Sequence, residues 1–182
     1  NVQTRLKKIE NEVVDATLLA LAGLKRLGMD EIIGESQTIT WEEMLPAVAQ
    51  GAIGIQCRSD DEKSLKYLAG LNHEPTKVAV DCERAFLAEL DGNCRTPIAG
   101  QAKIVGDKLV FKGLISKPDG KDMIRVEKEG PISDCVAIGT AAGEEVKKIA
   151  GDSFKDYGEA VAEIEAAAAA EKAAKDAAKA AA

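Results

Sequence analysis

The chain has 182 residues, of which 46% are hydrophobic and only 3% aromatic, and its formal net charge is −7 at pH 7. This length suits one domain of moderate size or two small ones, with a core built from aliphatic side chains. The acidic charge argues against a nucleic-acid-binding protein, because phosphate recognition needs clustered Lys and Arg. No apolar run reaches the length of a membrane span, so no membrane partner is expected.

Apolar runs in the first half of the chain predict buried strands of an α/β protein. Residues 13–22, VVDATLLALA, form a nearly continuous apolar run, which is typical of a strand covered on both faces. The segment GAIGIQC (51–57) predicts a second buried strand, and KVAV (77–80) predicts a third. After the first of these runs, GLKRLGM predicts a short helical turn that ends at Gly28.

Capping motifs predict helices between these strands. The segment TWEE (40–43) matches a capping box, so a helix should begin at Trp41. The segment SDDE (59–62) matches a second box and predicts a helix with a leucine face. Asp81 can cap a further helix over residues 82–90.

The second half of the chain predicts a small α+β domain. Three strand-like runs follow one another, over residues 98–105, 108–116 and 122–130. Turn sequences separate them, and a helical pattern follows over residues 134–150. Residues 93–165 therefore predict a three-stranded antiparallel sheet covered by helices. Residues 166–182 are an Ala-rich, low-complexity tail, for which we expect a solvated helix without a site.

The chain contains four cysteines, Cys57, Cys82, Cys94 and Cys135. None forms a C-x-x-C pair, and His73 is the only histidine, so no metal site is expected. Reduced thiols in an intracellular compartment are the simplest interpretation. Three of the four lie within apolar patterns and are interpreted as packing residues.

Cys94 differs from the other cysteines because it stands in the polar segment LDGNCRTP (90–97) after a predicted helix. A free cysteine is usually a small buried hydrophobe, but these neighbours favour an exposed thiol. The negative end of the helix dipole raises the pKa of a thiol at this position, and the adjacent Arg95 opposes that effect. Such a thiol is better suited to a covalent attachment that forms once and persists than to fast hydrolysis.

Two arginines and one histidine are further candidates. Arg26 follows the predicted strand 13–22, at the end of a strand where ligands of open α/β sheets bind, and its planar fork suits a carboxylate. Arg5 is the other notable cation, although an ordinary surface arginine remains the alternative for both. His73 is interpreted as a polar loop residue or a helix end rather than as a catalytic base.

Several segments of this chain resemble those of a known family and occur in the same order. They are NVQTRL, DATLLALAGLKRLG, LPAVAQGAIGIQCRSDD, LNHEPT, ERAFLAELDGNCRTPIAG and PDG. They resemble porphobilinogen deaminase, also called hydroxymethylbilane synthase, over about residues 1–150. The resemblance implies a transferase of tetrapyrrole (haem and chlorophyll) biosynthesis. That enzyme joins four porphobilinogen molecules head to tail, with release of ammonia, into hydroxymethylbilane.

The resemblance also implies the roles of individual residues. It implies a dipyrromethane cofactor joined to Cys94 through a thioether, on which the pyrrole chain grows. It implies that Arg5 and Arg26 bind the acidic side chains of the cofactor and of the growing chain. Gln50, in the Gly-rich segment AQGAIG (49–54), is a weaker candidate for lining the cleft.

The resemblance further implies how the chain is divided. Residues 1–49 and 70–92 correspond to the end of a second domain, and residues 50–69 to a returning segment of a first domain. Both of these domains would resemble periplasmic binding proteins. Residues 93–165 correspond to the third, cofactor-bearing domain. The family's catalytic aspartate is expected upstream of residue 1, so we expect the chain to be inactive alone, and we expect a monomer in the plastid stroma or the cytoplasm.

Two other functions remain open on the residues alone. One is a non-catalytic binding module, which would use Arg5 and Arg26 to hold a small carboxylated ligand. The other is a cysteine hydrolase with Cys94 as the nucleophile and His73 as its base. The hydrolase depends on a single histidine with no supporting motif and is the weakest of the three.

Overall fold

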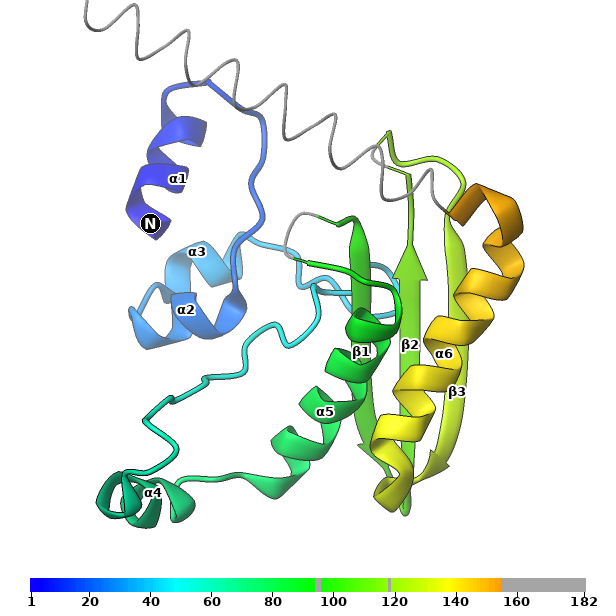
Figure 1. Cartoon of the computed structure of the whole chain (residues 1–182). Coiled ribbons are helices and arrows are strands. Elements are labelled where there is room, and N and C mark those ends of the chain that lie inside the picture. Colours follow the sequence, from blue (N-terminus) through cyan, green and yellow to red (C-terminus); the bar gives the residue numbers. More distant parts are fainter. Residues whose placement is uncertain (94–95, 118, 155–182) are drawn as a thin grey trace, which may run out of the picture. The chain divides into compact units, whose positions relative to one another are not determined.

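The computed structural model describes residues 1–93, 96–117 and 119–154 (Figure 1). The chain forms two compact units, of which the first comprises residues 1–43 and the second begins at Met44. The predictions for Cys94, for Arg95 and for the Ala-rich tail fall on residues outside the described part.

The first unit contains three short helices, α1 (Val2–Glu10), α2 (Leu21–Arg26) and α3 (Asp30–Gly34). Asn1 caps α1, because its side chain accepts a hydrogen bond from the Thr4 amide at 2.8 Å. Gly28 has φ 64° just after the end of α2, which confirms the predicted helical turn and its glycine. Leu24, in α2, is the one fully buried side chain among the described residues of this unit.

The strands predicted over residues 13–22 and 51–57 are wrong. Residues 13–20 contain no strand, Leu21 begins α2, and residues 51–57 are irregular. Val13 is 65% exposed and Ile53 is 76% exposed. A buried strand needs neighbouring strands for its backbone groups, and the strands found in the described residues all lie beyond residue 97. Apolar content alone therefore did not produce a strand.

The helix predicted to begin at Trp41 is also wrong, because residues 41–43 form only a turn. One half of the capping box is nevertheless present, since the Thr40 amide donates to the Glu43 carboxylate at 2.8 Å. Pro46 follows three residues after Glu43, and a proline in a helix interior removes a hydrogen bond and clashes with the preceding turn. The motif therefore closes a turn without starting a helix.

The second unit begins its regular structure with α4 (Glu62–Ala69) and α5 (Glu74–Glu89). The helix predicted from residues 59–62 is present as α4, but its cap is Asp61, which accepts from the Ser64 amide at 3.0 Å, and not the predicted Ser59. The strand predicted over residues 77–80 and the cap at Asp81 are wrong, because both lie inside α5. Pro75 stands in the first turn of α5, where its missing N–H costs nothing.

The antiparallel sheet and its final helix confirm the sequence prediction. The strands β1 (Ile98–Val105), β2 (Lys108–Ile115) and β3 (Ile124–Pro131) lie in the order β1-β2-β3. A short turn at Gly106, which has φ 64°, joins the first two strands. A single 3₁₀ turn (Ile132–Asp134) then leads into α6 (Cys135–Ala150). The molecule thus combines helices with a three-stranded antiparallel sheet.

α5 and α6 lie side by side against one face of this sheet, and the core lies between them (Figure 1). The rings of Phe86 and Phe111 meet at its centre with centroids 4.9 Å apart. Gly139 and Gly143 let the two helices approach closely, since a Cβ at Gly139 would lie 2.0 Å from the Cys82 carbonyl oxygen. The buried core residues are Cys82, Phe86, Leu90, Ile98, Ala102, Leu109, Phe111, Ile115, Val126, Ile138, Ala142 and Val146.

The three described cysteines differ in burial. Cys82 is fully buried, and its burial raises the pKa of the thiol to about 12. Cys135 is half-buried and packs against the core, so both agree with the packing interpretation. Cys57 is half-buried in an irregular segment rather than in the predicted strand.

Candidate functional site

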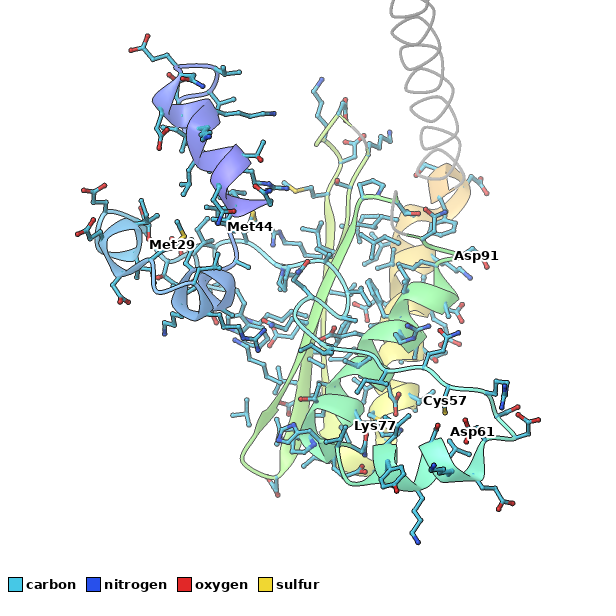
Figure 2. All side chains as sticks on the ribbon, turned by 90° about the vertical axis from the view of Figure 1, so that its left-hand side faces the viewer. Met29, Met44, Cys57, Asp61, Lys77 and Asp91 are labelled. Carbon is cyan, nitrogen blue, oxygen red and sulfur yellow. The ribbon has the colours of Figure 1, made fainter. Side chains whose placement is uncertain are left out.

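The segment that carries Cys94 connects the end of α5 to the start of β1. Asp91 adopts φ 50° just beyond the last turn of α5, while Lys77 lies in the helix's first turns (Figure 2). Gly92 follows, and a Cβ at this position would lie 2.5 Å from Ile98 Cδ1. The chain therefore leaves the helix so close to the core that only glycine fits there without a shift.

The residues on either side of Cys94 and Arg95 hold each other in place. The Asn93 amide donates to Thr96 Oγ1 at 3.0 Å, and the Thr96 amide donates to the Asn93 carbonyl at 3.1 Å. These two hydrogen bonds close a short loop whose base is fixed against the core. The prediction that Cys94 is an attachment site itself remains untested, because that residue lies outside the described part.

The two predicted arginines lie in the unit of residues 1–43. Arg5 is an exposed residue of α1, and its Nη1 donates to the Leu18 carbonyl at 3.1 Å. Arg26 is the exposed last residue of α2, not a residue that follows a strand. Their predicted role in binding carboxylates remains a prediction.

Gln50 lies in the second unit and borders a surface pocket of about 480 Å³. The pocket is lined by residues 49–52, by α5 and by residues 101–104 of β1. Residues 47–52 form two successive turns there, closed by bonds from the Gln50 amide to Ala47 O and from the Ala52 amide to Ala49 O. A hydrogen bond from the Gly100 amide to Pro46 O, at 3.0 Å, joins this segment to the edge of β1.

A buried carboxylate, which sequence reasoning missed, also holds this segment. Glu83 is 6% exposed and is the one buried charged side chain among the described residues. Its Oε2 accepts from the Ala49 amide at 2.7 Å, and its Oε1 accepts from the Ala102 amide at 2.8 Å. Burial raises the pKa of the Glu83 carboxyl, and the two amide bonds oppose that rise. The sequence signal that could have identified this carboxylate is that Glu83 is an acidic residue on the same helix face as Phe86.

The backbone at Ala49 is strained. Its φ of 58° lies in the left-handed region, which costs a residue with a Cβ about 1–2 kcal/mol. Gly51, two residues later, has φ 87°, a value that glycine adopts without this cost. The bond from the Ala49 amide to Glu83 helps to keep the strained conformation in place.

His73 and the segment that leads to Cys94 lie at opposite ends of α5. The His73 ring Nδ1 lies 2.8 Å from Thr76 Oγ1 at the N-terminal end of α5, which confirms the interpretation as a helix end. The segment that leads to Cys94 leaves the opposite end of the helix. At about 1.5 Å per residue, the 16 residues of α5 separate these ends by about 24 Å.

The described residues contain neither a cluster of metal-ligating side chains nor a membrane-spanning helix. No group of three or more His, Cys, Asp and Glu side chains there could hold a metal ion. Within residues 1–93, 96–117 and 119–154, no helix combines the length and the apolarity that crossing a bilayer requires.

Two family models match the sequence, and together they cover more than half of it. Residues 1–66 match the model described as porphobilinogen deaminase, dipyromethane cofactor binding domain. Residues 77–148 match the model described as porphobilinogen deaminase, C-terminal domain. The chain belongs to the porphobilinogen deaminase family. Arg5, Arg26 and Gln50 lie in the first match, and Cys94 lies in the second.

Curated relatives carry the same name. The chain is 54% identical over 157 residues to the chloroplastic porphobilinogen deaminase of Pisum sativum, a match that covers 85% of the chain and 42% of the relative. It is 52% identical over 159 residues to the chloroplastic protein of Oryza sativa subsp. japonica, covering 86% and 44%. It is 48% identical over 157 residues to the porphobilinogen deaminase of Paracoccus denitrificans, covering 86% and 50%. The chain thus spans half or less of the length of these porphobilinogen deaminases.

Proposed function

We propose that this chain is the C-terminal part of a transferase that polymerises four porphobilinogen molecules into hydroxymethylbilane. The observation that carries the proposal is the match to both family models, supported by identities near 50% to relatives of that name. Porphobilinogen and the growing pyrrole chain are then its small-molecule partners. Two of these relatives are named as chloroplastic and one is bacterial, so the plastid stroma and the cytoplasm both remain proposed compartments.

The loop around Cys94 suits a covalently held dipyrromethane. Asn93 is exposed, and its two backbone groups are hydrogen-bonded to Thr96 on the other side of Cys94 and Arg95. A dipyrromethane bound there supplies the terminal pyrrole to which porphobilinogen units are added. Because a thioether forms once and persists, the thiol at Cys94 needs no depressed pKa.

Arg5 and Arg26 would bind the acetate and propionate groups of the pyrroles. A guanidinium carries five N–H donors, and the bond from Arg5 to the Leu18 carbonyl uses one of them. The remaining donors form a planar fork that suits a carboxylate. Each added pyrrole brings more carboxylates, so a requirement for cationic side chains grows with the chain.

We also propose two partial domains of periplasmic-binding-protein type and a third domain that contains the sheet, with one change from the division that the sequence predicts. The predicted division assigns residues 70–92 to the second domain. The packing of α5 on the sheet favours placing residues 74–89 with the third domain instead. Exposed Ile53 and Ile55 suit a segment that passes to another domain.

The test is an intact mass spectrum of the full-length protein that contains this chain. We expect added mass equal to two pyrrole units, lost in Cys94→Ser and retained in the control Cys57→Ser. A wild-type protein without that added mass would contradict the proposal. Assayed alone, the 182-residue chain should form no hydroxymethylbilane, and sustained turnover would show that the fragment assignment is mistaken.

A further inference from the structure

Glu83 joins three parts of the second unit, namely α5, β1 and the turns that carry Gln50. We propose that Glu83 is a positioning residue, which fixes Gln50 relative to the two elements that lead into and out of the Cys94 loop. The inference rests on the proposed function, because it concerns Gln50, which the family resemblance predicts to line the cleft for the pyrrole chain.

Both carboxylate oxygens of Glu83 have defined partners. One oxygen accepts from Ala49, the residue before Gln50, and the other accepts from Ala102 in β1. Hydrogen bonds to a charged acceptor are stronger than neutral ones, and burial at 6% exposure shields them from water. A single side chain thus links the pocket wall to both secondary-structure elements.

The contact also replaces a missing strand neighbour. β1 is an edge strand of the sheet, so its outer amides lack strand partners. The Gly100 amide bonds to Pro46 O and the Ala102 amide bonds to Glu83. Residues 46–49 are therefore attached to β1 at two points, and Gln50 moves with the strand rather than with a loose loop.

The left-handed Ala49 supports a functional interpretation. A strained residue persists only where its surroundings determine its conformation, and such residues gather at ligand sites. The strain lies next to Gln50 and at the rim of the pocket. The hydrogen bond from the Ala49 amide to Glu83 is one of the contacts that hold it.

The first experiment measures amide hydrogen exchange in the 182-residue chain for wild type, Glu83→Gln and Glu83→Asp. We expect either the Ala49 amide or the Ala102 amide to exchange at least about tenfold faster in Glu83→Gln, because the Gln carbonyl oxygen can accept from one of these amides and its N–H₂ can accept from neither. The amides of β2 should keep their rates. Glu83→Asp keeps the charge, and its exchange rates should lie between those of wild type and of Glu83→Gln. Glu89→Gln is the matched control, since Glu89 lies in α5 and pairs with Lys147 at 2.9 Å.

The second experiment is a double-mutant cycle on porphobilinogen addition in the full-length protein. If Glu83 acts through Gln50, Glu83→Gln should slow addition in the wild-type background and cause little further loss in Gln50→Ala. A purely structural role would lower the rate by the same factor in both backgrounds. Glu89→Gln should leave the rate of addition unchanged.

The outcomes separate this inference from the proposed function. Unchanged exchange at both Ala49 and Ala102 in both Glu83 variants, or rate losses that multiply in the cycle, would overturn the positioning role. A wild-type protein without a dipyrromethane adduct would overturn the proposed function, and the exchange result would then decide only whether Glu83 holds the Ala49 and Ala102 amides. Faster exchange at Ala49 or Ala102, together with rate losses that do not multiply in the cycle, would establish the role.

Discussion

Residues 1–43 and residues 44–154 differ in whether their apolar side chains form a continuous core. In the first region Leu24 is buried, whereas Val13, Leu18 and Leu27 are each more than half exposed. In the second region two 16-residue helices and three 8-residue strands enclose a continuous core around Phe86 and Phe111.

The difference shows that element length and partners decide burial more than apolar content does. The helices of residues 1–43 have nine, six and five residues, and helices shorter than about 12–15 residues are marginal by themselves. Long amphipathic helices on a sheet instead bury one another's apolar faces. The sheet unit is therefore the part of this chain that has its own core.

The largest expected effect comes from separating the two regions. A peptide of residues 44–154 should keep its helical and strand signals in far-UV circular dichroism and unfold cooperatively in urea. A peptide of residues 1–43 should show no cooperative transition, because it buries too little apolar surface. Cooperative unfolding of the shorter peptide would remove the contrast between the regions.

The same substitution should have opposite effects in the two regions. Gly139→Ala places a Cβ 2.0 Å from the Cys82 carbonyl oxygen, so we expect the free energy of unfolding to fall by about 1–3 kcal/mol or more. Gly23→Ala in α2 meets nothing within 4 Å and should stabilise that helix by roughly 0.5–1 kcal/mol. Urea denaturation measures the first change and amide exchange within α2 measures the second. Equal effects would show that the close contact between α5 and α6 is unimportant.

The smallest expected effect is a difference in titration between one glutamate of each region. The bond from the Thr40 amide lowers the pKa of Glu43 below 4.5, so its contribution to stability is present above pH 4.5 and is lost as pH falls through the lowered value. Burial raises the pKa of Glu83 above 4.5, so the folded state keeps that proton longer than the unfolded state does. The stability that Glu83 contributes therefore falls as pH rises from 4.5 to its raised pKa.

Carboxylate ¹³C chemical shifts, followed by NMR from pH 2 to 8, check this prediction. The two resonances should titrate on opposite sides of 4.5, and Glu83→Gln should remove the upper one. A Glu83 resonance that titrates below 4.5 would contradict the burial described for it.

The sequence predicted the sheet of the second region well and the first region poorly. Alternating strands separated by turn residues such as Gly106 are local signals, and β1, β2, β3 and α6 follow them. Short apolar runs are ambiguous between strand, helix and irregular chain, which explains the errors over residues 13–22 and 51–57. The run at residues 77–80 became helical because α5 packs as a whole against the sheet.

By itself, the sequence determined the meander, the final helix and the membership of the family, because each depends on residue types at fixed local spacings. Its motifs also pointed to Cys94, Arg5, Arg26 and Gln50 as candidates. Only the tertiary structure decided that Glu83 holds the turns beside Gln50. That hydrogen bond joins residues 34 apart in the chain, and no local pattern specifies which backbone amides a buried carboxylate will meet once α5 packs on the sheet.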